Sequence, residues 1–145
     1  MIEYKFYSDY KHSISDIDSL NSLLTQLTQN PNKLTAVKLE KISENNRLLL
    51  ALDTDNKIIG MATLVLIAIP TGISGRIEDV VVDEKLRGQG IGTTLIKKLI
   101  TEGKKLHLKR IDLTSKPARI EANKLYLSLD FARYETNVYR IKLNQ

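Results

Sequence analysis

Apolar and polar residues recur with clear periods in the first third of the chain. Residues 2–8 alternate one by one, which predicts a strand. Residues 13–29 carry apolar side chains three or four positions apart, so they predict a helix with one apolar face. That face consists of Ile17, Leu20, Leu23, Leu24 and Leu27. Residues 34–42 predict a second, shorter helix.

The middle of the chain is dominated by strand patterns. Residues 47–52 and 57–69 predict two strands joined by a tight connection, and residues 74–82 predict a third. The strand at 57–69 lacks alternation over most of its length, which is typical of a central strand covered on both faces.

Helices and strands alternate in the last third. We expect a helix over residues 90–103, a strand over 108–114, a helix from Pro117 to about Leu129 and one or two closing strands within 131–143. The whole order predicts an α/β protein with a mixed sheet covered by helices on both faces. A length of 145 residues predicts a single domain over residues 1–145.

The composition narrows the chemistry. The chain has no cysteine, which excludes disulfides, thiolate metal sites and a cysteine nucleophile. Its two histidines, His12 and His107, show no metal-ligand spacing, so we expect no metal. The N-terminus lacks a basic leader with an apolar run, and the apolar stretch 58–69 is shorter than the roughly 20 residues of a membrane helix. We therefore expect a cytoplasmic protein with no membrane partner.

The formal net charge of +5 suits an anionic partner such as nucleic acid, an acidic membrane surface, a nucleotide or coenzyme A. Solubility alone explains so modest a charge at least as well. Surfaces that bind nucleic acid interleave basic and aromatic residues, and the sequence lacks that pattern. We therefore expect no nucleic-acid partner.

The sharpest local feature is a glycine-rich segment between a predicted strand and a predicted helix. It contains Arg87, Gly88, Gln89, Gly90, Ile91 and Gly92. The first N–H groups of a helix have no intrahelical partner, and glycines let a phosphate approach them. The spacing G-x-G-x-G differs from the dinucleotide fingerprint and from the P-loop, so neither nucleotide motif fits. An anion site is predicted, with a glycine-rich turn that binds nothing as the alternative.

This glycine segment resembles the R/Q-x-x-G-x-G/A signature of the GNAT superfamily of N-acetyltransferases. The resemblance implies a mostly antiparallel central sheet with a splayed parallel pair, and acetyl-CoA as the cosubstrate. It implies that the amides of residues 87–92 wrap the pyrophosphate, and that the preceding strand ends in a bulge. The backbone of that strand end would bind the pantetheine arm and the acetyl carbonyl through Val80, Val81 and Val82.

A second element of the resemblance lies downstream. Asn123 to Tyr126, followed by Leu129-Asp130-Phe131, is similar to the N-x-x-[LF]-Y…G-F element of the same family. It implies that Tyr126 is the general acid and that Asn123 binds the cofactor directly or through water. The alternative for Tyr126 is a core aromatic with a satisfied hydroxyl. Asp130 replaces the usual glycine, at a site that often ends the helix in a left-handed conformation.

The general base is less clearly marked. Glu78 and Asp79 precede the glycine segment and, as neighbours on a strand, point to opposite faces of the sheet. We take Glu78 as the candidate base, with a solvated or salt-bridged pair, or a water relay, as the alternatives. Residues 76–82 are similar to the run before the loop in the glucosamine-6-phosphate N-acetyltransferases. The front half of the chain shows no motif that would extend this similarity to the substrate.

The implied function is transfer of the acetyl group of acetyl-CoA, by direct attack, to a primary amine of a small molecule or protein. A non-catalytic acetyl-CoA-binding module of the same fold is the alternative. The sequence does not identify the amine, and the oligomeric state stays open, with a homodimer among the options.

Overall fold

The computed structural model of the protein describes residues 1–9 and 11–144. They fall into two units, Met1–Leu113 and Thr114–Gln145. The positions of the units relative to one another are not determined, so each unit is described by itself. The single domain expected over residues 1–145 stays a prediction.

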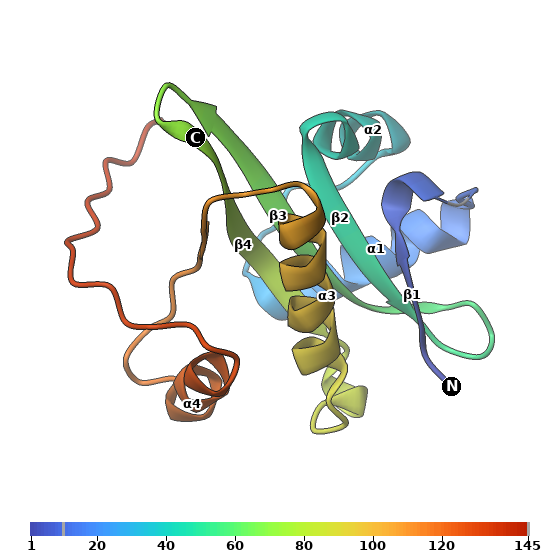
Figure 1. The fold of residues 1–145 in the computed structure, drawn as a ribbon. Coiled ribbons are helices and arrows are strands. Elements are labelled where there is room, and N and C mark those ends of the chain that lie inside the picture. The colour runs from blue at the N-terminus through green and yellow to red at the C-terminus, as the bar shows by residue number, and fades with distance from the viewer. Residues whose placement is uncertain (10, 145) are drawn as a thin grey trace. The chain divides into compact units, whose positions relative to one another are not determined.

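The first unit is built on a five-stranded sheet whose strands follow the chain order (Figure 1). The strands are β1 (Glu3–Phe6), β2 (Asn46–Leu52), β3 (Ile58–Ile69), β4 (Gly72–Val82) and β5 (Ile111–Asp112). Neighbours from β1 to β4 are antiparallel, whereas β4 and β5 are parallel. The expected mixed, mostly antiparallel sheet with one parallel pair is confirmed.

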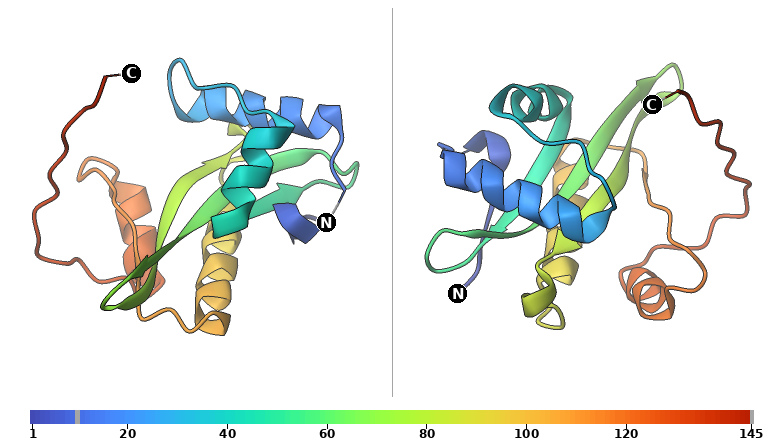
Figure 2. Two further views of the ribbon diagram at one scale, coloured as in Figure 1. Left: turned by 90° about the horizontal axis from the view of Figure 1, so that it is seen from above. Right: turned by 180° about the vertical axis from the view of Figure 1, so that it is seen from behind.

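Helices cover both faces of this sheet (Figures 1 and 2). The helices α1 (Ile14–Leu27) and α2 (Ala36–Asn45) lie on one face, and α3 (Ile91–Lys105) lies on the other. Two short 3-10 helices, η1 (Tyr7–Asp9) and η2 (Glu84–Leu86), follow β1 and β4. The predicted order of helices and strands is confirmed for this unit.

Side-chain caps explain where the first two helices begin. The Ser13 hydroxyl accepts a hydrogen bond from the Asp16 N–H at 3.3 Å, and the Asp16 carboxylate accepts one from the Ser13 N–H at 2.8 Å. This reciprocal capping box satisfies two N–H groups at the start of α1. The Thr35 hydroxyl starts α2 by accepting from the Lys38 N–H at 3.2 Å.

The central strands carry the core of the first unit. Residues 58–62 of β3 are all buried, which confirms a strand covered on both faces. Leu20 and Leu23 of the predicted apolar face of α1 are buried as well. One core cluster comprises Tyr7, Leu20, Leu23, Leu39, Leu48, Leu50, Leu52, Ile58, Met61 and Val81. Because Val81 belongs to this cluster, the core fixes the end of β4.

The strand expected over residues 108–114 is shorter than predicted. Only Ile111 and Asp112 form β5, opposite two residues of β4. Just before β5, the Lys109 N–H donates to the Ile73 carbonyl at 3.0 Å, so the contact with β4 continues without regular strand geometry.

The second unit contains α4 (Ile120–Ser128) and an extended tail. The expected helix is confirmed, but the closing strands expected within residues 131–143 are wrong, because residues 131–144, all of them described, contain no strand. The apolar side chains of the tail are exposed: Tyr134, Val138, Tyr139, Ile141 and Leu143. Alternation alone does not make a strand, since the backbone N–H and C=O groups also need a partner strand.

Candidate functional site

The strand that leads to the glycine segment contains a β-bulge. The register of β4 against β3 shifts between Met61 and Thr63, where β4 holds one residue more than β3. The extra residue falls at Asp79 and Val80, and Asp79 adopts a positive φ of 52°. A bulge bends its strand and increases the local twist. The strand end therefore has the bulge that the resemblance implied.

The edge of β4 that faces β5 is unpaired beyond its short parallel pairing with β5. β5 pairs with β4 only at Gly75 and Arg76. Among the described residues of the first unit, no strand pairs with the same edge of residues 77–82. Backbone N–H and C=O groups require hydrogen-bond partners. The splayed edge, which includes Val80, Val81 and Val82, is therefore suited to an extended polar ligand.

Cross-strand register shows which face of the sheet Glu78 occupies. Directly opposite residues project to the same face. Glu78 lies opposite Thr63, and Thr63 lies opposite Leu48. Because Leu48 belongs to the core cluster with Leu20 of α1 and Leu39 of α2, Glu78 faces the side of these two helices.

Two carboxylates at the bulge have different surroundings. Glu78 forms an ion pair with Arg76 on the same strand, which is the salt-bridged alternative named above. Partial burial, and then the negative charge of Glu78, raise the pKa of the Asp79 carboxyl. The residue Asp79 is nevertheless exposed, so a proton or a substrate can reach it.

Hydrogen bonds hold the segment that follows β4. The Gln26 side chain of α1 accepts from the Glu84 N–H at 2.8 Å. The Arg87 Nε donates to the Val82 carbonyl at 3.2 Å, and the residue stays exposed. The segment is thus tied to α1 and to the end of β4 while Arg87 faces solvent.

Two glycines keep the start of α3 open. Gly88 and Gly90 have positive φ values of 83° and 80°, a conformation that other residues rarely adopt. A Cβ at either position would meet no atom within 4 Å, so the space beside both is open. Gly90 is the N-cap of α3 and has no side-chain acceptor, which leaves the first N–H groups of the helix available. With Arg87 nearby in sequence, this helix start suits a phosphate.

The remaining predicted residues of the segment differ in exposure. Gln89 is exposed, whereas Ile91 is only 3% exposed and packs into the core. Ile91 can therefore offer a ligand its backbone but not its side chain. Gly92 lies in the first turn of α3, where an added Cβ would approach the Val82 Cγ2 to 3.7 Å.

The other predicted site residues lie in the second unit, on α4. The Asn123 Nδ2 donates to the Lys116 carbonyl at 3.0 Å, which ties the helix to the segment before it. Tyr126 is half-buried, and its ring meets the Phe131 ring edge to face with centroids 6.0 Å apart. Asp130 has a φ of 69°, which confirms the left-handed conformation expected after the helix.

The structure brings the end of β4 and the glycine segment together within the first unit. It does not join Asn123 and Tyr126 to them, because these residues belong to the second unit. Their roles in cosubstrate binding and proton transfer stay predictions.

Within residues 1–9 and 11–144, no three His, Asp or Glu side chains gather in a group that could hold a metal ion. Over the same residues, no helix is both long enough and apolar enough to cross a membrane.

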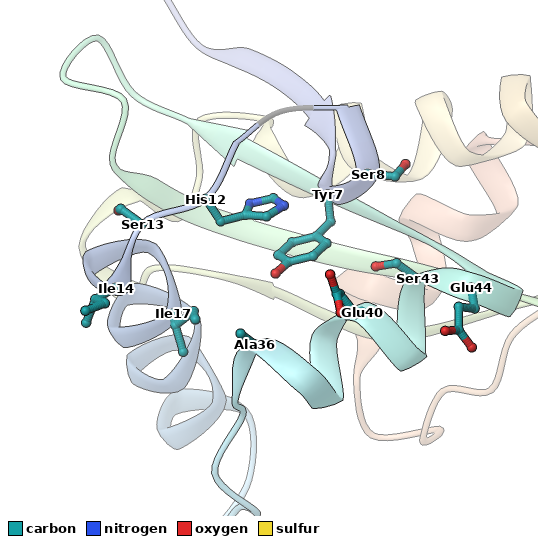
Figure 3. Close-up of a pocket in the computed structure, with 10 residues that line it drawn as sticks. All are labelled: Tyr7, Ser8, His12, Ser13, Ile14, Ile17, Ala36, Glu40, Ser43 and Glu44. Carbon is teal, nitrogen blue, oxygen red and sulfur yellow. The ribbon is translucent and has the colours of Figure 1, made fainter.

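A hollow of about 760 Å³ between η1, α1 and α2 was not predicted from the sequence (Figure 3). Tyr7 lines it from η1, Glu40 lines it from α2, and His12 lines it just before α1. No motif or spacing links these positions, and only the fold brings them together.

A bulged strand with a free edge that leads into an open, glycine-rich helix start defines a site for an extended, phosphate-bearing ligand. The sequence matches the acetyltransferase (GNAT) family over residues 16–131, so the protein belongs to that family. Its mixed sheet with the parallel β4–β5 pair is the fold of that family. Members typically use acetyl-CoA.

Solved structures agree along the length of the chain. An acetyltransferase from Trypanosoma brucei is 27% identical and has a TM-score of 0.78, covering 99% of this chain and 100% of the other. Glucosamine-6-phosphate N-acetyltransferase from Arabidopsis thaliana is 20% identical with a TM-score of 0.75, covering 96% and 98%. Ribosomal-protein-alanine N-acetyltransferase from Brucella melitensis is 18% identical with a TM-score of 0.74, covering 99% and 100%.

The last two structures are named for different acceptors, a sugar phosphate and a protein residue. At 20% and 18% identity, each shows a shared fold only.

Proposed function

We propose that this acetyltransferase is an N-acetyltransferase that moves the acetyl group of acetyl-CoA directly to a primary amine of a small molecule or protein. The observation that carries the proposal is the junction of β4 and α3. There the positive φ values of Gly88 and Gly90 keep a helix start open beside a free strand edge. The absence of cysteine and of a membrane-type apolar stretch supports a cytoplasmic location.

The residues at the junction fit both polar parts of acetyl-CoA. Its pyrophosphate needs N–H donors and positive charge, and the loop amides of residues 88–92 and the Arg87 guanidinium supply both. The pantetheine arm carries amides, which would pair with the backbone groups of Val80, Val81 and Val82 that β3 and Arg87 leave unpaired. Because the space beside Gly88 and Gly90 is open, a phosphate would reach the backbone without steric conflict.

Acetyl-CoA supplies a thioester carbonyl that an amine can attack. In the transfer, a bond forms between the amine nitrogen and the acetyl carbon, and the carbon–sulfur bond breaks. The amine must lose a proton, and the departing thiolate must gain one. Since the chain has no cysteine, no acetyl-cysteine can form, which supports direct transfer.

Three side chains are candidates for the proton transfers. Glu78 is the candidate base, and its ion pair with Arg76 would hold the carboxylate in one orientation. Asp79 is the alternative base, because its raised pKa favours proton uptake. Tyr126 is the candidate acid, since a phenol can donate its proton to a thiolate. We propose that Asn123 contacts the cosubstrate through its remaining amide oxygen.

Tyr126→Phe tests the catalytic part of the proposal. Removal of the phenolic proton donor should lower kcat by about 100-fold or more, while acetyl-CoA affinity stays near that of the wild type. The rate is measured by thiol release with a panel of amine acceptors, and the affinity by thermal shift. Tyr134→Phe is the matched control, because Tyr134 is 84% exposed in the tail, and it should leave both quantities unchanged.

Two outcomes would contradict the proposal. A protein that acetyl-CoA does not stabilise against unfolding has no cosubstrate site, since a ligand of the native state must stabilise it. A protein that acetyl-CoA does stabilise, but that transfers no acetyl group to any amine, would be a binding module.

A further inference from the structure

The hollow between η1, α1 and α2 lies apart from the proposed transfer site. It opens at the β1 side of the sheet, where Tyr7 directly follows β1. Glu78 and Asp79 lie on β4, three strands further along the sheet. Three strand spacings amount to roughly 14 Å. A small molecule in the hollow would therefore not reach the bulge of β4.

The lining of the hollow is negative, although the protein as a whole is positive. Among the described lining residues, Glu40 and Glu44 are carboxylates from consecutive turns of α2, and His12 is the residue with a basic side chain. The chain carries a formal net charge of +5. A negative hollow in a positive protein favours a cation over the phosphates and carboxylates that the rest of the surface attracts.

A buried phenol faces the hollow. Tyr7 is 4% exposed, and Figure 3 shows its hydroxyl turned into the space between α1 and α2, with the Glu40 carboxylate beside the ring. No hydrogen bond joins this hydroxyl to another described residue. Burial, the charge of Glu40 and the charge of Asp16 raise the pKa of Tyr7, so the phenol stays neutral. A neutral phenol oxygen can accept a hydrogen bond from a cation.

A second buried oxygen belongs to Ser43 of α2. Its Oγ is shielded from solvent and has no hydrogen-bond partner among the residues described. Buried hydroxyls without partners are costly and call for an explanation. An ammonium group carries three donors, which would serve Tyr7, Ser43 and Glu40 at once.

The other walls suit an alkyl chain attached to the ammonium. The Tyr7 and His12 rings are stacked, with centroids 3.5 Å apart and planes 6° apart, and aromatic faces attract cations. Ile14 and Ile17 add apolar surface from the first turn of α1. The hollow thus combines negative charge, aromatic faces and aliphatic surface.

We propose that this hollow is a second binding site, for an alkylammonium ion, separate from the site of acetyl transfer. Glu40 pairs with the ammonium, the Tyr7 and Ser43 hydroxyls accept its remaining hydrogen bonds, and the isoleucines of α1 cover its chain.

Binding of n-butylammonium to the full chain without acetyl-CoA tests this site. In an NMR titration, amide shifts should concentrate on η1, the start of α1 and α2, and butanoate should cause none there. Glu40→Gln should weaken binding at least tenfold, because a hydrogen bond to a charged group contributes enough for that factor. Tyr7→Phe keeps the buried ring and should weaken binding several-fold. Glu135→Gln, in the exposed tail, is the matched control and should change nothing.

The proposal is overturned if butanoate binds as well as n-butylammonium, or if Glu40→Gln and Tyr7→Phe leave the affinity unchanged. Neither result bears on acetyl transfer, because the titration contains no acetyl-CoA.

A second arm identifies where the ammonium comes from. If it is the far end of a long acceptor, Glu40→Gln should raise the KM of dodecane-1,12-diamine and leave that of n-butylamine unchanged. If the site serves a separate ligand, both KM values should stay as they are while n-butylammonium binding is lost. Each outcome supports a cation site and assigns its source.

Discussion

In the first unit, α3 places Leu95, Ile96 and Leu99 against the sheet, and each is at most 1% exposed. In the second unit, none of the nine residues of α4, all of which the structure describes, is buried. The glycine segment is thus carried by an element fixed through tertiary packing. Tyr126 is carried by a helix of the second unit whose end is closed by local hydrogen bonds.

The ends of these two helices show that the local rules are the same in both units. The second residue beyond each helix is left-handed, His107 with a φ of 56° after α3 and Asp130 with a φ of 69° after α4. After α4, the Phe131 N–H donates to the Tyr126 carbonyl at 3.0 Å, and the two rings are in contact. This is a Schellman motif with its hydrophobic contact. The turn therefore does not distinguish the two helices.

Truncation of one leucine in each helix should give the largest contrast. Leu99→Ala removes a side chain with 0% exposure and should cost about 2–5 kcal/mol of unfolding free energy. Leu127→Ala, on α4, removes a side chain with 55% exposure and should change stability by less than about 0.5 kcal/mol. Urea unfolding of both variants measures the difference. Equal losses would show that α4 is packed as tightly as α3.

Alanine at Gly90, the N-cap of α3, and at Gly92, in its first turn, should separate backbone strain from helix propensity. Gly90→Ala forces a φ of 80° on a residue with a Cβ and should cost about 1–2 kcal/mol. Gly92→Ala lies in the first turn with a Cβ contact of 3.7 Å and should gain up to about 1 kcal/mol. Urea unfolding gives both values. If the proposed function is right, Gly90→Ala should also weaken stabilisation by acetyl-CoA, and Gly92→Ala should preserve it.

The same physics explains what could be predicted from the sequence. The periodicity of α1 reports a buried face, and Leu20 and Leu23 occupy it. The glycine segment stands out because glycine is the residue that tolerates the positive φ of Gly88 and Gly90. Both signals are local, so a single sequence contains them.

Non-local features were missed for a physical reason. Nothing in the residues around Asp79 marks a bulge, and the resemblance to a family was needed to expect one. The tail over 131–143 alternates like a strand, but strand formation depends on a neighbour that the pattern does not contain. Tyr7 and Glu40 meet only because η1 and α2 fold together.

Asp130→Gly should strengthen the end of α4. Glycine adopts a φ of 69° without the steric cost that a Cβ imposes, so the variant should be more stable by about 0.5–1 kcal/mol. Thermal unfolding measures the gain. Asp130→Ala is the control and should lose stability instead, because alanine lacks both the freedom of glycine and the tolerance of aspartate. A loss of stability with glycine would mean that the Asp130 carboxylate has a role beyond the turn.

Asp79 is the second aspartate with a positive φ, and its contribution to stability should depend on pH. This effect should be the smallest of the four stability effects. Burial and Glu78 raise its pKa, so the folded state binds the proton more tightly than the unfolded state. The corresponding stability is complete below the ordinary aspartate pKa of about 3.9 and is lost as pH rises through the folded-state pKa. Asp79→Asn removes the charge and keeps a side chain that tolerates a positive φ.

Relative to the wild type, the Asp79→Asn variant should therefore become more stable as the pH rises from about 4 to about 7. The gain should be less than about 1 kcal/mol, because solvent screens an exposed carboxylate. Urea unfolding at the two pH values measures the gain. If the variant and the wild type differ in stability by the same amount at both pH values, the charge of Asp79 does not destabilise the fold. That result would also argue against Asp79 as the base that takes the proton of the amine.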